Sequence, residues 1–240
     1  GNCSSIEEAN RFSMNNFSNT ELEKIVQYVL VNDYYIICGH VRPDGDCISS
    51  SLSLYNILKV LGKSVHVLLC GKEPLNERYH FLAGHEHFEN TENFLENSGD
   101  LSKWHMFLVD APSLNRLDKP AQQIFESSSF TLDIDHHPNE KPLANLHYAD
   151  TSSASCSAIL WRLHKLLCDF SQYKPSKEQV KDIAACCYTG LVTDTGSFAF
   201  QNTNTQAFSL AAEMTQAGVV ASDVNENLFQ SENFAKFEMN

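Results

Sequence analysis

Side chains that bind metal ions follow three short apolar runs of the chain. The run 34–38 leads to His40, Asp44 and Asp46, the run 106–109 to Asp110, and the run 131–134 to Asp135, His136 and His137. One more carboxylate, Asp194, lies in a Thr-Asp-Thr-Gly segment after an apolar stretch. Carboxylates crowded into a partly desolvated site repel one another unless cations lie between them. These residue types therefore predict a metal centre.

The predicted ligand set has about the size that two ions need when water and substrate complete their shells. Its members are His40, Asp44, Asp46, Asp110, His136 and Asp194. Imidazole mixed with carboxylate favours manganese, iron or zinc over magnesium or calcium. Because Asp44 and Asp46 stand on one Gly-containing turn, each can face a different ion, and Asp110, alone at its strand end, is the natural bridge. We expect two divalent ions, and the residue types alone leave manganese, iron and zinc open.

Each segment taken alone has an ordinary structural interpretation. Asp44-Gly45-Asp46 is more often a turn whose Asp caps the next helix. Asp110 could cap a turn at Pro112, His136-His137 is most often a surface pair, and Thr193 to Gly196 is typical of an Asx turn. Their joint occurrence at successive strand ends is what favours the metal centre.

The elements that must position these side chains alternate between strands and helices. Apolar runs at 34–38, 65–70, 106–109 and 131–134 predict strands buried on both faces, and a period near 3.6 predicts helices at 21–31, 48–61, 156–167, from about 176, and at 208–214. This alternation predicts an α/β fold, a doubly wound, mainly parallel sheet flanked by helices. Ligands bind beyond the carboxyl ends of such strands, where the candidate ligands lie.

The segment 71–103 is polar and predicts a connection with one short helix. It contains His85-Glu86-His87, which could imitate a metal site. Side chains two apart share a face only in a strand-like segment, and no other candidate ligand is predicted to converge there. We interpret this histidine pair as part of a surface loop.

Charge and composition exclude several classes of protein. The 240 residues carry a formal net charge of −13. This charge argues against a protein that binds a nucleic-acid duplex, because duplex affinity rests on Lys and Arg contacts to phosphates. With 42% hydrophobic residues, the chain is not expected to be disordered. No apolar stretch has the length of a membrane span, and no signal-peptide pattern opens the chain. The 8 cysteines form no C-x-x-C pair, which favours reduced thiols and a cytoplasmic location.

The first residues suggest a lipid anchor. An initiator Met placed before Gly1 would give M-G-x-x-x-S, the N-myristoylation pattern, and Cys3 could take a second acyl group. One acyl chain alone anchors weakly, and no basic patch is near, so Cys3 would have to supply the second signal. The alternative is a glycine left by tag removal. Membrane association through acylated Gly1 and Cys3 is therefore one expectation for a cytoplasmic protein.

Five segments together resemble a known family. Asp135-His136-His137 resembles the signature of the DHH phosphoesterases, and His40-x-x-x-Asp44-Gly45-Asp46 is similar to their first motif. Asp110-Ala111-Pro112, Thr151 to Ser155, and Thr193 to Phe198 are similar to the later motifs in order and spacing. The resemblance covers residues 34 to about 218 and is greatest to the nanoRNase/pAp phosphatase and cyclic-dinucleotide phosphodiesterase branch.

The resemblance implies roles for individual residues. It implies one manganese ion on His40, Asp44 and Asp110, and a second on Asp46, Asp110, His136 and Asp194. The expected metal is therefore Mn²⁺, with Mg²⁺ or Co²⁺ as alternatives. It also implies that Asp135 orients the neighbouring imidazoles and that His137 contacts phosphate. A water between the two ions would attack phosphorus in line.

Further residues could bind the substrate. Thr151, Ser152 and Ser153 are predicted to begin the helix that runs to Cys168, so that their hydroxyls and free N–H groups would form an anion site. Ordinary N-capping is the competing interpretation, and the two are compatible. Arg116, six residues after Asp110, could reach a phosphate oxygen or could be a solvated loop arginine. Arg42 is a weaker candidate.

We expect a flexible arm at 1–18, a DHH catalytic domain at 19–220, and a C-terminal helix or start of a linker at 221–240. The related branch usually continues into a second domain with a G-G-G-H stretch, and this sequence has no such stretch. Either a second domain lies outside this sequence, or the protein has the catalytic domain alone.

The sequence therefore predicts a manganese-dependent phosphoesterase for a small nucleotide phosphate or short oligonucleotide, of the pAp, nanoRNA or dinucleotide type. One alternative is an inorganic pyrophosphatase or exopolyphosphatase of the DHH superfamily, and another is a non-catalytic nucleotide-binding module. The expected partner is the small substrate, and duplex nucleic acid is not expected. The oligomeric state stays open, with a homodimer among the options.

Overall fold

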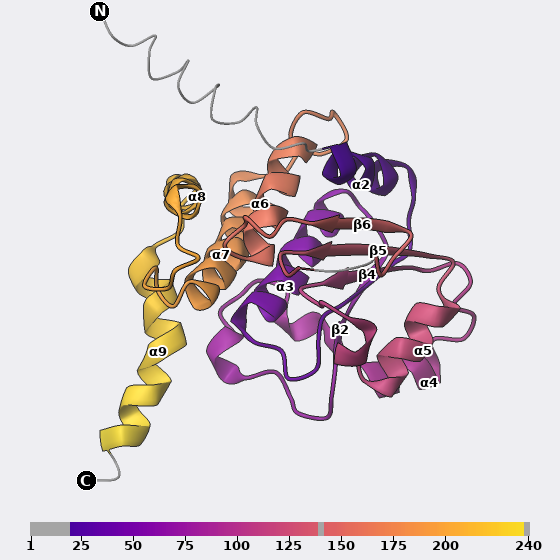
Figure 1. Ribbon diagram of the computed structural model, residues 1–240, viewed down its shortest axis with the longest axis horizontal. Helices are drawn as coiled ribbons and strands as arrows, with labels where there is room; N and C mark the ends of the chain where they lie inside the picture. The colour runs from indigo at the N-terminus through magenta and orange to yellow at the C-terminus, as the bar shows by residue number, and fades with distance from the viewer. Residues whose placement is uncertain (1–19, 139–141, 238–240) are drawn as a thin grey trace, which may run out of the picture.

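The computed structural model describes residues 20–138 and 142–237 (Figure 1). The predicted arm at 1–18, with Gly1 and Cys3, lies outside the described residues. Within them, six strands form one sheet in the order β3-β2-β1-β4-β5-β6, and every neighbouring pair is parallel. The strands are β1 Tyr35–Cys38, β2 Val65–Leu69, β3 Phe88–Asn90, β4 His105–Val109, β5 Phe130–Asp135 and β6 Leu146–Ala149. The predicted doubly wound α/β fold is confirmed.

Helices cover both faces of the sheet because the central strands are apolar on both sides. Tyr35 and Ile37 of β1 belong to one buried cluster, and Ile36 and Cys38 belong to a second cluster on the opposite face. Figure 1 shows α4 and α5 on one side of the sheet and α3, α6 and α7 on the other. The helices are α2 Thr20–Val31, α3 Gly45–Val60, α4 Thr91–Asn97, α5 Lys119–Ser127, α6 Cys156–Leu167, α7 Lys177–Asp194, α8 Thr205–Gln216 and α9 Ala221–Phe237.

The chain reverses the direction in which it builds the sheet between β1 and β4. From β1 it passes outward to β2 and β3, and it then returns to place β4 on the other side of β1, followed by β5 and β6. Loops that leave adjacent strands in opposite directions open a crevice at their carboxyl ends, where α/β proteins bind ligands. The segments that follow β1 and β4 carry His40 and Asp110 to this point.

Two of the strands were not predicted from the sequence. The edge strand β3 lies inside the segment 71–103, which also holds the short 3₁₀ turns η1 Glu77–Tyr79 and η2 His85–His87 and the helix α4. The other missed strand is β6, at the opposite edge. The histidine pair of η2 is partly or fully exposed, and it belongs to none of the groups of metal-binding side chains found among the described residues.

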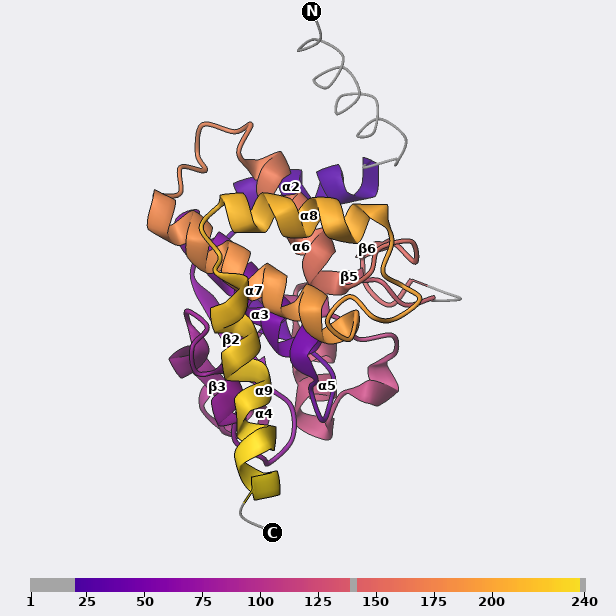
Figure 2. The ribbon, with the colours of Figure 1, turned by 90° about the vertical axis from the view of Figure 1, so that its left-hand side faces the viewer.

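The outer helices lie on the α7 side of the molecule. Figure 2 shows α8 crossing in front of α6 and α9 running from the region of α7 toward the C-terminal end of the chain. Helix α9 packs against the turn η1, and α8 packs against α7. In the part of the chain that the structure describes, no helix has the length and apolar character needed to cross a bilayer.

Candidate metal centre

The loop after β1 presents His40 and Asp44 to the crevice. His40 is 5% exposed, and its Nδ1–H donates to the carbonyl of Val41 at 2.9 Å, which leaves Nε2 to face the centre. Asp44 caps α3, because one carboxylate oxygen accepts from the N–H of Cys47 at 3.1 Å. The other oxygen lies 3.8 Å from His40 Nε2. Capping and facing the centre are therefore compatible roles for this carboxylate.

Asp46 lies in the first turn of α3 and is 1% exposed. Its two carboxylate oxygens accept from the N–H groups of Cys156, at 2.6 Å, and Ser157, at 3.1 Å, which are the first residues of α6. The positive end of the α6 dipole thus faces a buried carboxylate. The carboxylate fits because Gly190 of α7 has no side chain, since a Cβ there would lie 2.5 Å from Asp46 Oδ1 and 2.4 Å from Ser157 Oγ.

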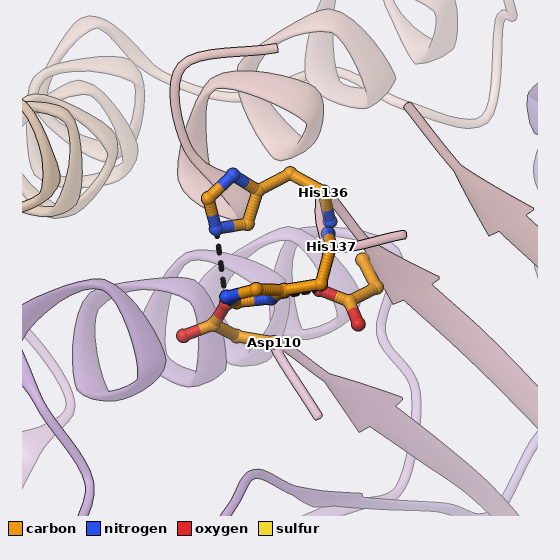
Figure 3. Close-up of side chains that lie close together, drawn as sticks. Asp110, His136 and His137 are labelled. Atoms are coloured by element: carbon orange, nitrogen blue, oxygen red, sulfur yellow. Dashed lines mark hydrogen bonds and ion pairs between the residues drawn. The ribbon is translucent and has the colours of Figure 1, made fainter. Parts of the chain in front are cut away.

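Asp110 stands between the two histidines of the centre. Its backbone has a φ of 55°, a left-handed conformation that is uncommon outside glycine and that clusters at functional sites. Oδ2 lies 3.7 Å from His40 Nε2, and Oδ1 lies 3.5 Å from His136 Nε2 and 3.6 Å from His137 Nδ1. Figure 3 shows both imidazoles directed from the end of β5 toward this carboxylate at the end of β4.

Asp135 fixes the two histidines that follow it. One buried carboxylate oxygen accepts from the backbone N–H of His136 at 2.7 Å, from that of His137 at 3.1 Å, and from Nδ1 of His137 at 2.8 Å. The ring of His137 is therefore oriented by Asp135, while that of His136 is oriented through its backbone. His137 keeps 42% of its side chain exposed, so solvent reaches the ring although Nδ1 is bound to Asp135.

Asp194 closes the centre from the end of α7. Its Oδ2 lies 3.6 Å from His136 Nε2, and the side-chain amide of Asn202 donates to its carbonyl at 3.0 Å and to Oδ2 at 3.4 Å. The same amide donates to the carbonyl of Ala154 at 3.0 Å. Asn202 therefore ties the carboxylate to the segment that precedes α6.

The side chains form two groups that share Asp110. Nε2 of His40 lies near carboxylate oxygens of Asp44 and Asp110, and Nε2 of His136 lies near those of Asp46, Asp110 and Asp194. In the described part of the chain, three sets of side chains have ligand atoms that all lie within 4.8 Å of one another: His40, Cys47 and Asp110; Asp46, His136 and Asp194; and Asp110, Asp135, His136 and His137. Within each group, Nε2 lies 3.5 to 3.9 Å from the carboxylate oxygens. Two ligands that each bind one ion at about 2.1 Å can be up to about 4.2 Å apart, so this spacing fits a shared ion. Asp110 Oδ1 and His136 Nε2 are buried without a hydrogen bond, which a metal ion would satisfy.

The electrostatics of the protein alone also indicate a need for cations. Burial, with the charge of Asp110, raises the pKa of Asp46 to about 8, and burial raises the pKa of Asp194 to about 6. Burial acts to lower the pKa of His136, but the nearby carboxylate of Asp110, together with those of Asp46 and Asp194, raises it to about 10. Without metal, the site must bind protons to relieve carboxylate repulsion, a role that divalent ions can take over.

The segment Thr151 to Ser153, which was predicted to bind the substrate, does not form the start of a helix. Helix α6 begins at Cys156 with Ser155 as its N-cap, so the expectation that Thr151, Ser152 and Ser153 begin it is wrong. The prediction missed that the chain turns at this segment, where Asp150 accepts from the N–H and hydroxyl of Ser152. The Ser153 hydroxyl is buried and donates to the carbonyl of Ser155.

The first N–H groups of α6 are also not open to an anion, because Asp46 already accepts from them. Arg116 lies in the 3₁₀ turn Leu114–Arg116 with its side chain exposed, and its carbonyl accepts from the N–H of Val41 at 2.7 Å. Its backbone therefore supports the loop of His40. The backbone of Arg42, in the same loop, is left-handed with a φ of 52°.

Three residues at the centre were missed in the sequence. Gly190 makes room for Asp46, Asn202 holds Asp194, and Cys47 is buried with its Sγ within 4.8 Å of ligand atoms of His40 and Asp110. Cys47 could have been suspected, because it directly follows the Asp-Gly-Asp segment. Gly190 acts through packing between helices and Asn202 through hydrogen bonds from a turn after α7, and no local pattern reveals either contact.

Fold and site together define a parallel α/β protein with a two-part His/Asp centre at the switch point of its sheet. The chain belongs to the DHH family, because residues 35–191, more than half of its length, match the DHH family N-terminal domain. The predicted resemblance to DHH phosphoesterases is therefore confirmed, and the family supports the predicted enzyme class, a phosphoesterase hydrolase.

Relatives cover most of this chain but are longer than it. The bifunctional oligoribonuclease and PAP phosphatase NrnA of Thermus thermophilus is 31% identical over 192 residues, which are 80% of this chain and 52% of the relative. The protein of the same name from Bacillus subtilis is 26% identical over 212 residues, 87% of this chain and 61% of the relative. The chain thus spans about half to three fifths of these relatives.

Solved structures support the fold. An exopolyphosphatase-related protein from Bacteroides fragilis superposes with a TM-score of 0.78 at 23% identity, over 90% of this chain and 62% of that protein. A putative family II inorganic pyrophosphatase from Methanococcus jannaschii superposes with a TM-score of 0.54 at 17% identity, over 81% and 60% of the two chains. At these identities the likeness concerns the fold alone.

Proposed function

We propose that this chain is the catalytic domain of a phosphoesterase that hydrolyses small nucleotide phosphates or short oligonucleotides with two divalent ions, of which Mn²⁺ is the expected metal. One observation carries the proposal: the buried carboxylate of Asp110 is shared by two groups of ligand atoms whose spacing fits ions. A carboxylate placed between two such groups suits a pair of ions about 3.5–4 Å apart.

Each group would hold one ion. His40, Asp44 and Asp110 would bind the first, and Asp46, Asp110, His136 and Asp194 the second. Ions bound there supply positive charge for the phosphoryl oxygens and lower the pKa of water to near neutrality. The protein's own part is to hold the ligands rigidly, through the Val41 carbonyl on His40 and the first N–H groups of α6 on Asp46.

His137 is placed to bind the substrate itself. Its hydrogen bond to Asp135 raises the pKa of the imidazole, so the ring holds its proton more firmly than a free histidine. With Nδ1 bound to Asp135, Nε2 of the partly exposed ring can donate to a phosphate oxygen in the crevice. Asp135 thus acts through His137, as a positioning residue.

The nature of the relatives favours a nucleotide substrate. Proteins named oligoribonuclease and PAP phosphatase match 80% or more of this chain at 26–31% identity. The pyrophosphatase and exopolyphosphatase alternative is supported by structural likeness only, at lower identity. A non-catalytic nucleotide-binding module is disfavoured because all six proposed ligands are present.

The test is hydrolysis of pAp, a dinucleotide and pyrophosphate with Mn²⁺, Mg²⁺, Co²⁺ or EDTA. We expect turnover of the nucleotide substrates with Mn²⁺, none in EDTA, and none for Asp110→Asn, whose left-handed backbone Asn tolerates. Asp169→Asn, at an exposed carboxylate after α6, is the matched control and should keep full activity. Activity confined to pyrophosphate, or turnover by Asp110→Asn, would contradict the proposal.

A further inference from the structure

A cleft of about 460 Å³ lies directly beside the metal centre. It is lined by the loop before α3, by the 3₁₀ turn η1, by the end of α7 and by Phe229 of α9. Its volume lies in the range of small-molecule sites. A larger cavity of about 710 Å³ lies between α2 and the end of α6, and no candidate metal ligand lines it. The smaller cleft is therefore the one that chemistry at the centre can use.

The cleft and the metal centre share a wall. Asp44 lines the cleft and also faces His40, and 62% of its side chain is exposed. Thr193, which lines the cleft as well, directly precedes Asp194. At the floor, Gly45 packs so closely on Thr193 that a Cβ would lie 2.4 Å from its methyl carbon. A ligand whose phosphate lies at the centre would extend into this cleft.

The turn η1 forms a rigid side of the cleft. Asn76 caps it, since its Oδ1 accepts from the N–H of Arg78 at 3.1 Å, and Tyr79 anchors it with only 5% exposure. The guanidinium of Arg78 lies 5.4 Å from the centre of the Tyr79 ring. These contacts hold a cationic side chain in the wall, and a preorganised wall costs little entropy on binding.

The lining combines an aromatic ring, a cation and an amide. Phe229 keeps 39% of its surface exposed, Arg78 brings a positive charge to a protein of net charge −13, and Asn76 contributes an amide. Bases stack on aromatic rings whatever their sequence, and guanidinium groups bind phosphate oxygens. Pyrophosphate and polyphosphate have no group that would use an aromatic wall.

We infer that this cleft binds the nucleoside of the nucleotide whose phosphate lies at the metal centre. The ring of Phe229 stacks on the base, and Arg78 binds an oxygen of the same nucleotide. The inference rests on the proposed function for the position of the phosphate, and it deepens that function by selecting nucleotides over inorganic phosphoanhydrides.

Binding experiments test the cleft apart from hydrolysis. AMP is titrated into protein with Mn²⁺ by calorimetry, and adenosine into protein with EDTA by NMR. We expect Phe229→Ala to weaken both on the order of tenfold, the effect of losing one stacked base, and Phe229→Trp to restore both. Phe208→Ala, at a ring of α8 that is 56% exposed, is the matched control and should change neither. Equal binding of adenosine to Phe229→Ala and the unaltered protein would overturn the inference.

Kinetics separate this inference from the proposed function. Phe229→Ala and Arg78→Met should raise KM for a dinucleotide several-fold with little change in kcat, while any turnover of pyrophosphate stays the same. Dinucleotide hydrolysis with an unchanged KM in both variants would refute the inference that the cleft binds the nucleoside, and would leave the proposed phosphoesterase function intact. Absence of all metal-dependent turnover would refute the proposed phosphoesterase function. The adenosine titration would still show whether the cleft binds a nucleoside.

Discussion

The substitution Gly190→Ala tests whether packing between helices sets the position of Asp46. In the interior of α7, alanine would by itself stabilise the helix by about 0.5–1 kcal/mol relative to glycine. The added Cβ would, however, lie 2.4 Å from Ser157 Oγ and 2.5 Å from Asp46 Oδ1. Since heavy atoms normally approach to about 3.5 Å, a shift of roughly 1 Å is required. Both neighbours are buried and hydrogen-bonded, so neither moves freely.

Overpacking costs about 1–3 kcal/mol, and weakening a hydrogen bond to a buried carboxylate costs about 1.5–3 kcal/mol more. With the gain in helix propensity subtracted, we expect Gly190→Ala to lower the free energy of unfolding by about 2–5 kcal/mol in urea with EDTA, and to weaken Mn²⁺ binding at least tenfold in calorimetry. The control is Ser209→Ala, an exposed position of α8. If Gly190→Ala were as stable as the unaltered protein and bound Mn²⁺ equally well, the packing argument would be wrong.

Three further predictions concern a buried histidine, the residue that holds Asp194, and a helix cap. Nδ1 of His164 lies in hydrogen-bond contact with the Tyr173 hydroxyl at 2.7 Å, and burial lowers the pKa of the imidazole to about 4. This value is below the unfolded one near 6.5, so the unfolded chain binds the extra proton. Stability should therefore fall by up to about 3 kcal/mol as pH falls from 6.5 to 4, and urea titrations of His164→Gln should show a smaller fall. Asn202→Ala should weaken Mn²⁺ binding about 10–100-fold by releasing Asp194, measured by metal titration. Asp118→Ala should cost about 2–4 kcal/mol in thermal unfolding, because this carboxylate caps α5 and also binds the loop after β2 and the start of α4.

The strands that carry the site were predictable because burial on both faces leaves an unbroken apolar run. The segment Tyr35–Cys38 reads Tyr-Ile-Ile-Cys and is fully buried, and the residues at its end could be placed at the sheet edge from this pattern alone. The two edge strands have weaker patterns. Phe88–Asn90 has three residues with one apolar side chain, and Leu146–Ala149 has a histidine inside it that pairs with Asp133 of the neighbouring strand. Their pairing depends on the rest of the sheet.

The start of α6 was predicted too early because several residues before it are equally good caps. Thr151, Ser152 and Ser153 all carry hydroxyls, but Ser155 has the extended backbone of the cap and accepts from the N–H of Ala158. Asp46, 110 residues earlier in the chain, then binds the N–H groups of the first turn. A contact between segments so far apart in the sequence leaves no trace in local composition.

The bond between Asp46 and α6 has a consequence for observing the site. The N–H groups of Cys156 and Ser157 donate to the carboxylate that would bind an ion, so any ion that draws electron density from this carboxylate alters both amides. Their nitrogen and proton chemical shifts should move on titration with diamagnetic Mg²⁺ or Zn²⁺. In ¹⁵N-labelled protein, two backbone amides of a core helix, neither of them a ligand, would thus report the occupancy of the centre.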